Sequence, residues 1–164
     1  MRERALLGLA LAMLLVSPIG GATIAAEAPG LVLVGSNGAT TSLTLAEIAS
    51  LPAVTREISF EGEHGAVTTR FSGPPLWTLL VRARIVPGDP RSHVRMTVTT
   101  TGADGYTAVL ALAEIDPAFE GKEVLLATEQ DGKPVTGTGL RQAVPGDKRG
   151  GRSVRDVVRI AVGG

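Results

Sequence analysis

The sequence contains no cysteine among its 164 residues. This absence excludes every chemistry that needs a cysteine sulfur: thiol catalysis, dithiol redox chemistry, iron–sulfur clusters, cysteine zinc sites and thioether-bound haem. Aromatic residues make up only 3 % of the chain, so a folded core must consist mainly of Val, Leu, Ile and Ala. The G-x-x-x-x-G-K-S/T and G-x-S-x-G motifs are also missing, which removes sequence support for a P-loop or a nucleophile elbow.

Residues 1–26 have the layout of a bacterial-type secretory signal peptide. Arg2 and Arg4 form a basic head, 5–16 is an apolar run, and small residues follow. An apolar run of about a dozen residues is too short for a stable membrane anchor. We expect cleavage of this segment, a mature domain at 27–164, a periplasmic or secreted location, and no stable membrane anchor after cleavage.

Charge is balanced, with 16 basic and 16 acidic residues. Removing the predicted signal peptide leaves a net charge of about −1. A general nucleic-acid binder needs a positive excess, so we expect no nucleic-acid partner. The remaining length fits one domain with a modest core.

The mature region alternates short β-prone runs with turn signals, which predicts a β-rich single domain of the α+β class with a few short helices. The predicted strands are Leu31–Val34, Thr40–Leu45, Val54–Phe60, Ala66–Phe71, Val94–Thr100 (with His93 at its start), Tyr106–Leu110, Val124–Thr128, Gly139–Val144 and Val154–Val162. A capping box of Thr44 and Glu47 predicts one short helix, and Pro75 at a first turn predicts another over Leu76–Val81.

The stretch RQAVPGDKRGGRSVRDV, residues 141–157, concentrates positive charge near the end of the chain. Its cations are Arg141, Lys148, Arg149, Arg152 and Arg155. Its glycines permit turns that aim backbone N–H groups at an anion, and arginine binds phosphate in a bidentate manner. Composition leaves two interpretations open: an anion site and a solvated basic loop.

A second candidate cluster is the turn with Glu61, Glu63 and His64. Two carboxylates and one imidazole can bind a metal weakly. A solvated polar turn explains the same residues, and we therefore expect no metal site.

Four segments, in order, resemble the oxidoreductase molybdopterin-binding domain family. FSGPPLWTLL (Phe71–Leu80) is similar to W-x-G-V-P-L-x-x-L-L, and DGYTAVLALAE (Asp104–Glu114) to D-G-Y-x-x-x-L-x-L-x-E. VLLATEQDGKP (Val124–Pro134) is similar to V-L-L-A-y-E-x-d-G-x-P-L. LRQAVPG (Leu140–Gly146), followed by RSVR (Arg152–Arg155), is similar to L-R-l-V-v-P-G with a later x-V-K/R.

This resemblance implies a sulfite-oxidase-type fold, which in full-length members buries a molybdopterin whose phosphate is held by basic residues. By resemblance, Arg141, Lys148, Arg149 and Arg152 bind a pterin cofactor or another small anionic ligand. Arg141 matches an arginine that lies near the oxyanion substrate in sulfite-oxidising members.

The chain departs from the catalytic members at the metal ligand. Those members hold molybdenum through a cysteine, and Ser59 takes that position when Glu61-Gly62 is aligned with the family's E-G. Enzyme activity therefore stays open. One hypothesis is an exported oxidoreductase-family domain that binds a pterin or other anion; the other is a non-catalytic periplasmic binding or accessory module with a redox partner and no molybdenum.

Overall fold

The computed structural model describes residues 30–62 and 64–164. The predicted signal peptide at 1–26 lies outside the described residues. The helices are α1 (Leu45–Ala49), α2 (Leu76–Arg82), α3 (Pro90–His93), α4 (Leu112–Ile115) and the 3-10 turn η1 (Gly150–Arg152). The strands are β1 (Leu31–Val34), β2 (Thr40–Leu43), β3 (Val54–Gly62), β4 (Gly65–Gly73), β5 (Thr97–Gly102), β6 (Thr107–Ala111), β7 (Leu125–Ala127), β8 (Glu129–Gln130), β9 (Lys133–Pro134), β10 (Arg141–Ala143) and β11 (Val157–Gly163). The predicted α+β class is confirmed.

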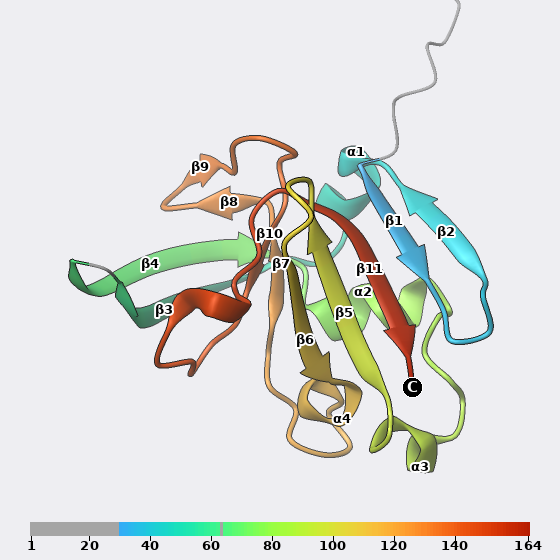
Figure 1. Cartoon of the computed structure of the whole chain (residues 1–164). Helices are drawn as coiled ribbons and strands as arrows, with labels where there is room; N and C mark the ends of the chain where they lie inside the picture. Colours follow the sequence, from blue (N-terminus) through green and yellow to red (C-terminus); the bar gives the residue numbers. More distant parts are fainter. Residues whose placement is uncertain (1–29, 63) are drawn as a thin grey trace, which may run out of the picture.

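A five-stranded sheet in the order β2-β1-β11-β5-β6 dominates the fold (Figure 1). The first and last strands pair in parallel, with Val32 opposite Arg159, and the other pairs are antiparallel. The predicted hairpin at Asn37-Gly38 is confirmed, since it joins β1 to β2 and Gly38 has a positive φ of 79°.

The main core lies between this sheet and α1 and α2; α2 passes behind the sheet in Figure 1. The Thr44–Glu47 capping box is present and starts α1, which buries Ile48 against the core. Helix α2 follows Pro75 and buries Leu76, Leu79 and Leu80, the apolar stripe expected of a helix with one covered face. No helix in the described part of the chain is long and apolar enough to cross a bilayer.

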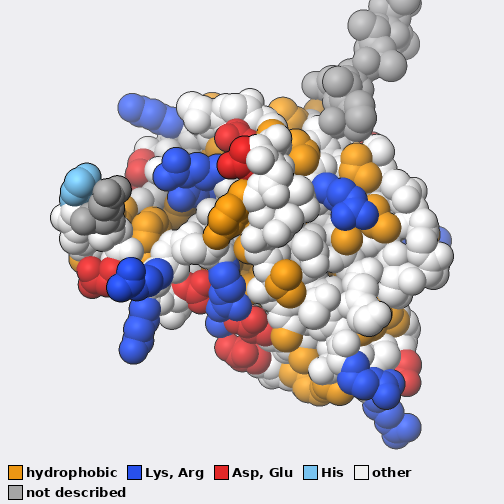
Figure 2. Space-filling model, in the orientation of Figure 1, with side chains coloured by type: hydrophobic (Ala, Val, Ile, Leu, Met, Phe, Trp, Pro, Cys, Tyr) orange, Lys and Arg blue, Asp and Glu red, His pale blue; other side chains and the backbone are white. Residues whose placement is uncertain are grey.

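The opposite face of the sheet carries threonine, valine and alanine, with few charges. On β5 the side chains of Val98 and Thr100 are buried, while Thr97, Thr99 and Thr101 alternate with them on the other face. Figure 2 shows this side of the molecule, with charged side chains scattered among uncharged surface.

The long β3–β4 hairpin forms a second sheet with β8 and β9, and the pair β10–β7 links the two sheets. A smaller core fills this region, formed by Ile58, Phe71, Leu125, Ala127 and Ala143. The junction is tight at Gly73, where an added Cβ would lie 2.2 Å from the Leu126 carbonyl oxygen.

The Gly73→Ala variant should therefore be destabilised by about 3 kcal/mol. The atoms that the new Cβ would meet belong to the backbone, which cannot move aside as a flexible side chain can. Gly88→Ala is the matched control, since a Cβ at Gly88 meets nothing within 4 Å. Urea unfolding of both variants measures the difference, and equal stabilities would contradict a close strand crossing at Gly73.

The structure corrects the prediction that His93 begins a strand. His93 ends α3, which Asp89 caps through the backbone N–H of Arg91, and β5 begins only at Thr97. The His93 imidazole is buried; its Nδ1 lies 2.6 Å from an oxygen of Asp116 and its Nε2 lies 2.8 Å from the Pro87 carbonyl oxygen. The sequence pattern missed this pair because its partners are distant in sequence.

Burial alone would lower the pKa of His93, but the hydrogen bonds to Asp116 and Pro87 and the charges of Asp116 and Asp89 raise it above its usual value. The stability that this pair contributes is then fully present below the unfolded pKa of about 6.5 and is lost as the pH rises through the higher folded pKa. Urea unfolding from pH 5 to 9 should show this decline. Asp116→Asn should reduce this pH dependence and lower the free energy of unfolding by about 3 kcal/mol at low pH. An unchanged pH dependence would contradict its assignment to the His93–Asp116 pair.

Candidate functional site

Arg141 on β10 carries a buried donor atom that the described fold does not satisfy. This atom, Nε, has no hydrogen-bond partner among residues 30–62 and 64–164, and NH1 donates only a long bond, 3.3 Å, to Gln130 Oε1. The guanidinium carbon lies 5.3 Å from the centre of the Phe71 ring. Burial and the nearby charge of Arg155 lower the pKa of Arg141. A buried donor without a partner is costly, so this position favours an anionic ligand.

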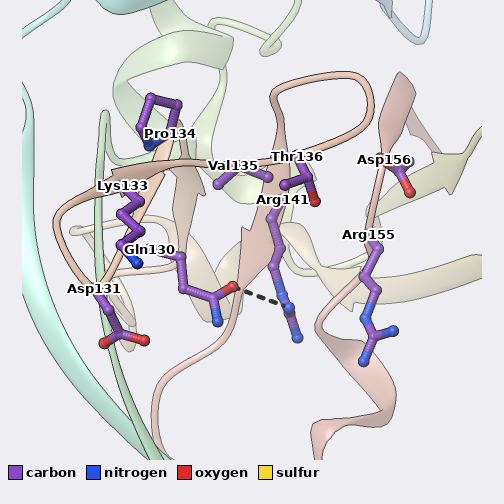
Figure 3. A pocket seen from close by; sticks show the side chains of 9 residues that line it. All are labelled: Gln130, Asp131, Lys133, Pro134, Val135, Thr136, Arg141, Arg155 and Asp156. Carbon is purple, nitrogen blue, oxygen red and sulfur yellow. Dashed lines mark hydrogen bonds between the residues drawn. The ribbon is translucent and has the colours of Figure 1, made fainter.

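Arg155 lies beside Arg141, and both residues line two adjoining pockets. The first, which we call the hairpin pocket, has a volume of about 430 Å³. Figure 3 shows the two arginine side chains extending into it in the same direction. It is lined by Gln130, Asp131, Lys133, Pro134, Val135, Thr136, Arg141, Arg155 and Asp156.

The hairpin pocket presents more free positive than negative charge. Asp131 accepts a hydrogen bond from the backbone N–H of Arg70, and Asp156 accepts one from that of Thr138. Both carboxylates are thus partly satisfied by the backbone. Lys133, Arg141 and Arg155 form no ion pair with any described residue. These cations can receive an anion in a bidentate or bridging manner.

The second, which we call the loop pocket, has a volume of about 360 Å³ and lies between the β3 end and η1. Tyr106 donates its hydroxyl to the Gly151 carbonyl at 2.6 Å, and Asp104 accepts the Tyr106 N–H at 2.9 Å. The D-G-Y turn thus holds η1 at the pocket edge. The pocket is lined by Phe60, Glu61, Gly62, Asp104, Tyr106, Arg141, Gly150, Gly151, Ser153 and Arg155.

Arg152 has a different environment from Arg141. Its guanidinium donates two bonds to Glu114, both at 3.1 Å, and two to Asp147, at 2.9 and 2.6 Å. These bonds raise the pKa of Arg152, since they outweigh its desolvation. Burial would raise the pKa of Glu114, but Lys122 and Arg152 lower it. Arg152 therefore holds the loop in place by ion pairs within the protein.

Lys148 and Arg149 lie at the exposed end of the loop and line neither pocket. The Lys148 carbonyl accepts the Glu61 N–H at 2.8 Å, which fixes the loop to the end of β3. The four predicted site residues thus do not converge on one pocket. Arg155, which the site prediction omitted, joins Arg141 instead. The sequence marked it as one cation of the basic stretch 141–157 and as the basic position of the x-V-K/R segment.

The fold and this two-arginine pocket define the chain as an α+β domain with a candidate anion site. The family model of the oxidoreductase molybdopterin binding domain matches residues 30–163, and the chain belongs to this family. A search of curated proteins found no match.

Among solved structures, the sulfane dehydrogenase SoxCD from Paracoccus pantotrophus is similar to this chain, with a TM-score of 0.66 and 18 % identity. The match covers 81 % of this chain and 37 % of the SoxCD chain, so this chain spans well under half of that protein. At this identity the likeness shows the fold, and the predicted sulfite-oxidase-type architecture is confirmed.

The residues present fit only part of a molybdopterin. The orphaned Nε of Arg141 and the adjacent Arg155 suit the phosphate of such a group. The metal end does not fit, because the sequence supplies no thiolate. Ser59, at the aligned ligand position, is exposed on β3 and shares a hydrogen bond with Thr68 at 2.7 Å, outside both pockets.

The structural role of Arg152 can be separated from ligand binding. Arg152→Gln should lower the free energy of unfolding by about 2 kcal/mol, because it removes the cation that pairs with Asp147 and leaves Glu114 paired with Lys122 alone. Lys148→Gln, in the same loop, should change it by less than about 0.5 kcal/mol. Chemical denaturation without added anion is the measurement; equal effects of the two substitutions would contradict the distinction.

Proposed function

We propose that this chain is an exported domain that binds an anionic ligand between Arg141 and Arg155, with the phosphate of a pterin or a simpler oxyanion as the bound group. The observation that carries this proposal is the buried Nε of Arg141, next to Arg155; neither this atom nor Arg155 has a partner in the described part of the chain. Lys133 adds a third cation at the rim of the hairpin pocket. The apolar run before residue 27 supports export to the periplasm or the exterior.

The second candidate is a non-catalytic binding or accessory module that partners a periplasmic redox protein. The missing thiolate favours it, because the chain can keep the anion-binding half of the family's site without the metal-binding half. Lys148 and Arg149, exposed beyond both pockets, offer positive charge to such a partner. Molybdenum and pterin content of the protein purified from its exported form separates the two candidates: stoichiometric molybdenum would reject the accessory module.

The anion site can be tested by calorimetric titration with pyrophosphate. Arg141→Gln and Arg155→Gln should each weaken binding by about tenfold or more, since each removes charge-assisted hydrogen bonds. Lys148→Gln and Arg149→Gln are matched controls and should stay within about twofold, the small effect of distant exposed charges. Circular dichroism checks that each variant is folded. Unchanged affinity in both pocket variants, or loss in the two controls alone, would overturn the proposal.

A further inference from the structure

A third hollow lies away from the two-arginine site, between β2, α1 and the C-terminal end of α2. Its volume is about 280 Å³, and it shares no lining residue with the hairpin pocket or the loop pocket. We call it the helix pocket. It is lined by Thr41, Leu43, Glu47, Ser50, Leu51, Leu79, Arg82, Ala83 and Arg84.

The helix pocket combines leucine side chains with polar groups, and its rim is positively charged. Leu51 and Leu79 are buried and Leu43 is half-buried, whereas Arg82 and Arg84 are exposed. Neither arginine forms an ion pair with any residue in the described ranges. Apolar side chains beside a few charged groups can bind a small molecule that has both an apolar and a charged part.

Glu47 is the one acidic residue of the helix pocket, and its charge is partly satisfied. Its Oε2 accepts the Thr44 N–H at 2.7 Å and the Thr44 hydroxyl at 3.0 Å in the capping box. These hydrogen bonds lower the pKa of Glu47, so it stays ionised at neutral pH. Two arginines against one carboxylate leave the rim with an excess of positive charge.

The backbone of Arg84 gives an independent reason to assign a role to its side chain. Helix α2 ends in a Schellman motif, in which Arg84 N–H donates to the Val81 carbonyl at 3.0 Å and Ile85 N–H to the Leu80 carbonyl at 3.3 Å. Arg84 has a φ of 57°, at the position where glycine is strongly preferred. The motif closes through backbone atoms alone, so the helix end does not require arginine there. A non-glycine residue in this left-handed conformation at the mouth of a pocket points to a functional role for its side chain.

We propose that the helix pocket binds a small organic acid with an apolar chain. The chain lies against Leu43, Leu51 and Leu79, and the carboxylate pairs with Arg82 and Arg84. The guanidinium groups give charge-assisted hydrogen bonds to the carboxylate, and the leucines supply hydrophobic contact in proportion to the chain area that they cover. This site is separate from the proposed anion site, so each proposal can fail alone.

Calorimetric titration of the whole chain with hexanoate, acetate and hexanol tests the ligand class. Hexanoate should bind at least about tenfold more tightly than acetate, which lacks the apolar chain, and than hexanol, which lacks the charge. Equal affinities for hexanoate and acetate, or for hexanoate and hexanol, would overturn the proposal.

The Arg84→Gly variant separates ligand binding from the helix end. It should raise the Tm by about 3 °C, because glycine suits the left-handed position, and yet weaken hexanoate binding by about tenfold. Arg84→Lys keeps the charge but not the guanidinium geometry, and should retain more hexanoate affinity than Arg84→Gly. Arg159→Gln, at an exposed arginine on β11, is the matched control and should bind hexanoate as the parent does.

Unchanged hexanoate affinity in Arg84→Gly would show that the pocket does not use this cation and would overturn the proposal. Loss of hexanoate binding in Arg141→Gln, with retention in Arg84→Gly, would place the carboxylate in the two-arginine site and would also overturn it.

Discussion

The Arg152 guanidinium lies between the carboxylates of Asp147 and Glu114, and the geometry of the C-terminal loop depends on this contact. Asp147 belongs to the loop, whereas Glu114 lies on α4 at the end of the main sheet, so one side chain ties the two together. Gln142 reinforces the link, because its amide accepts the Thr100 hydroxyl at 2.6 Å and donates to the Arg152 carbonyl at 2.8 Å. The loop is therefore fixed by contacts within the protein, and Arg155 follows it directly into the pocket.

Local signals in the sequence were sufficient for most elements of the fold. The Asn37-Gly38 turn and the Thr44–Glu47 capping box each act within a few residues, so their predictions were confirmed. Helix α3 was missed because four residues carry too little periodicity. The burial of its His93 depends on Asp116, 23 residues further along the chain.

The candidate site was harder to predict for the same physical reason. Composition makes Arg141 and Arg152 equivalent cations, but the fold gives Arg152 two carboxylates. It gives Arg141 an aromatic ring and a buried nitrogen to which no described residue bonds. One of these carboxylates, Asp147, is near in sequence, but Glu114 lies 38 residues before Arg152, so its contribution depends on the tertiary fold. Family membership fixed the fold, whereas the chemistry of the site had to be argued from these individual contacts.

The parallel pairing of β1 with β11 has a consequence for how this chain reaches its folded state. Strand β11 lies at the centre of the five-stranded sheet, between β1 and β5. During synthesis, β1–β2 and β5–β6 can form only as separate hairpins until residues 157–163 have emerged and joined them. Contacts between such distant segments slow folding. The five-stranded sheet is therefore complete only when its last strand has paired with both hairpins.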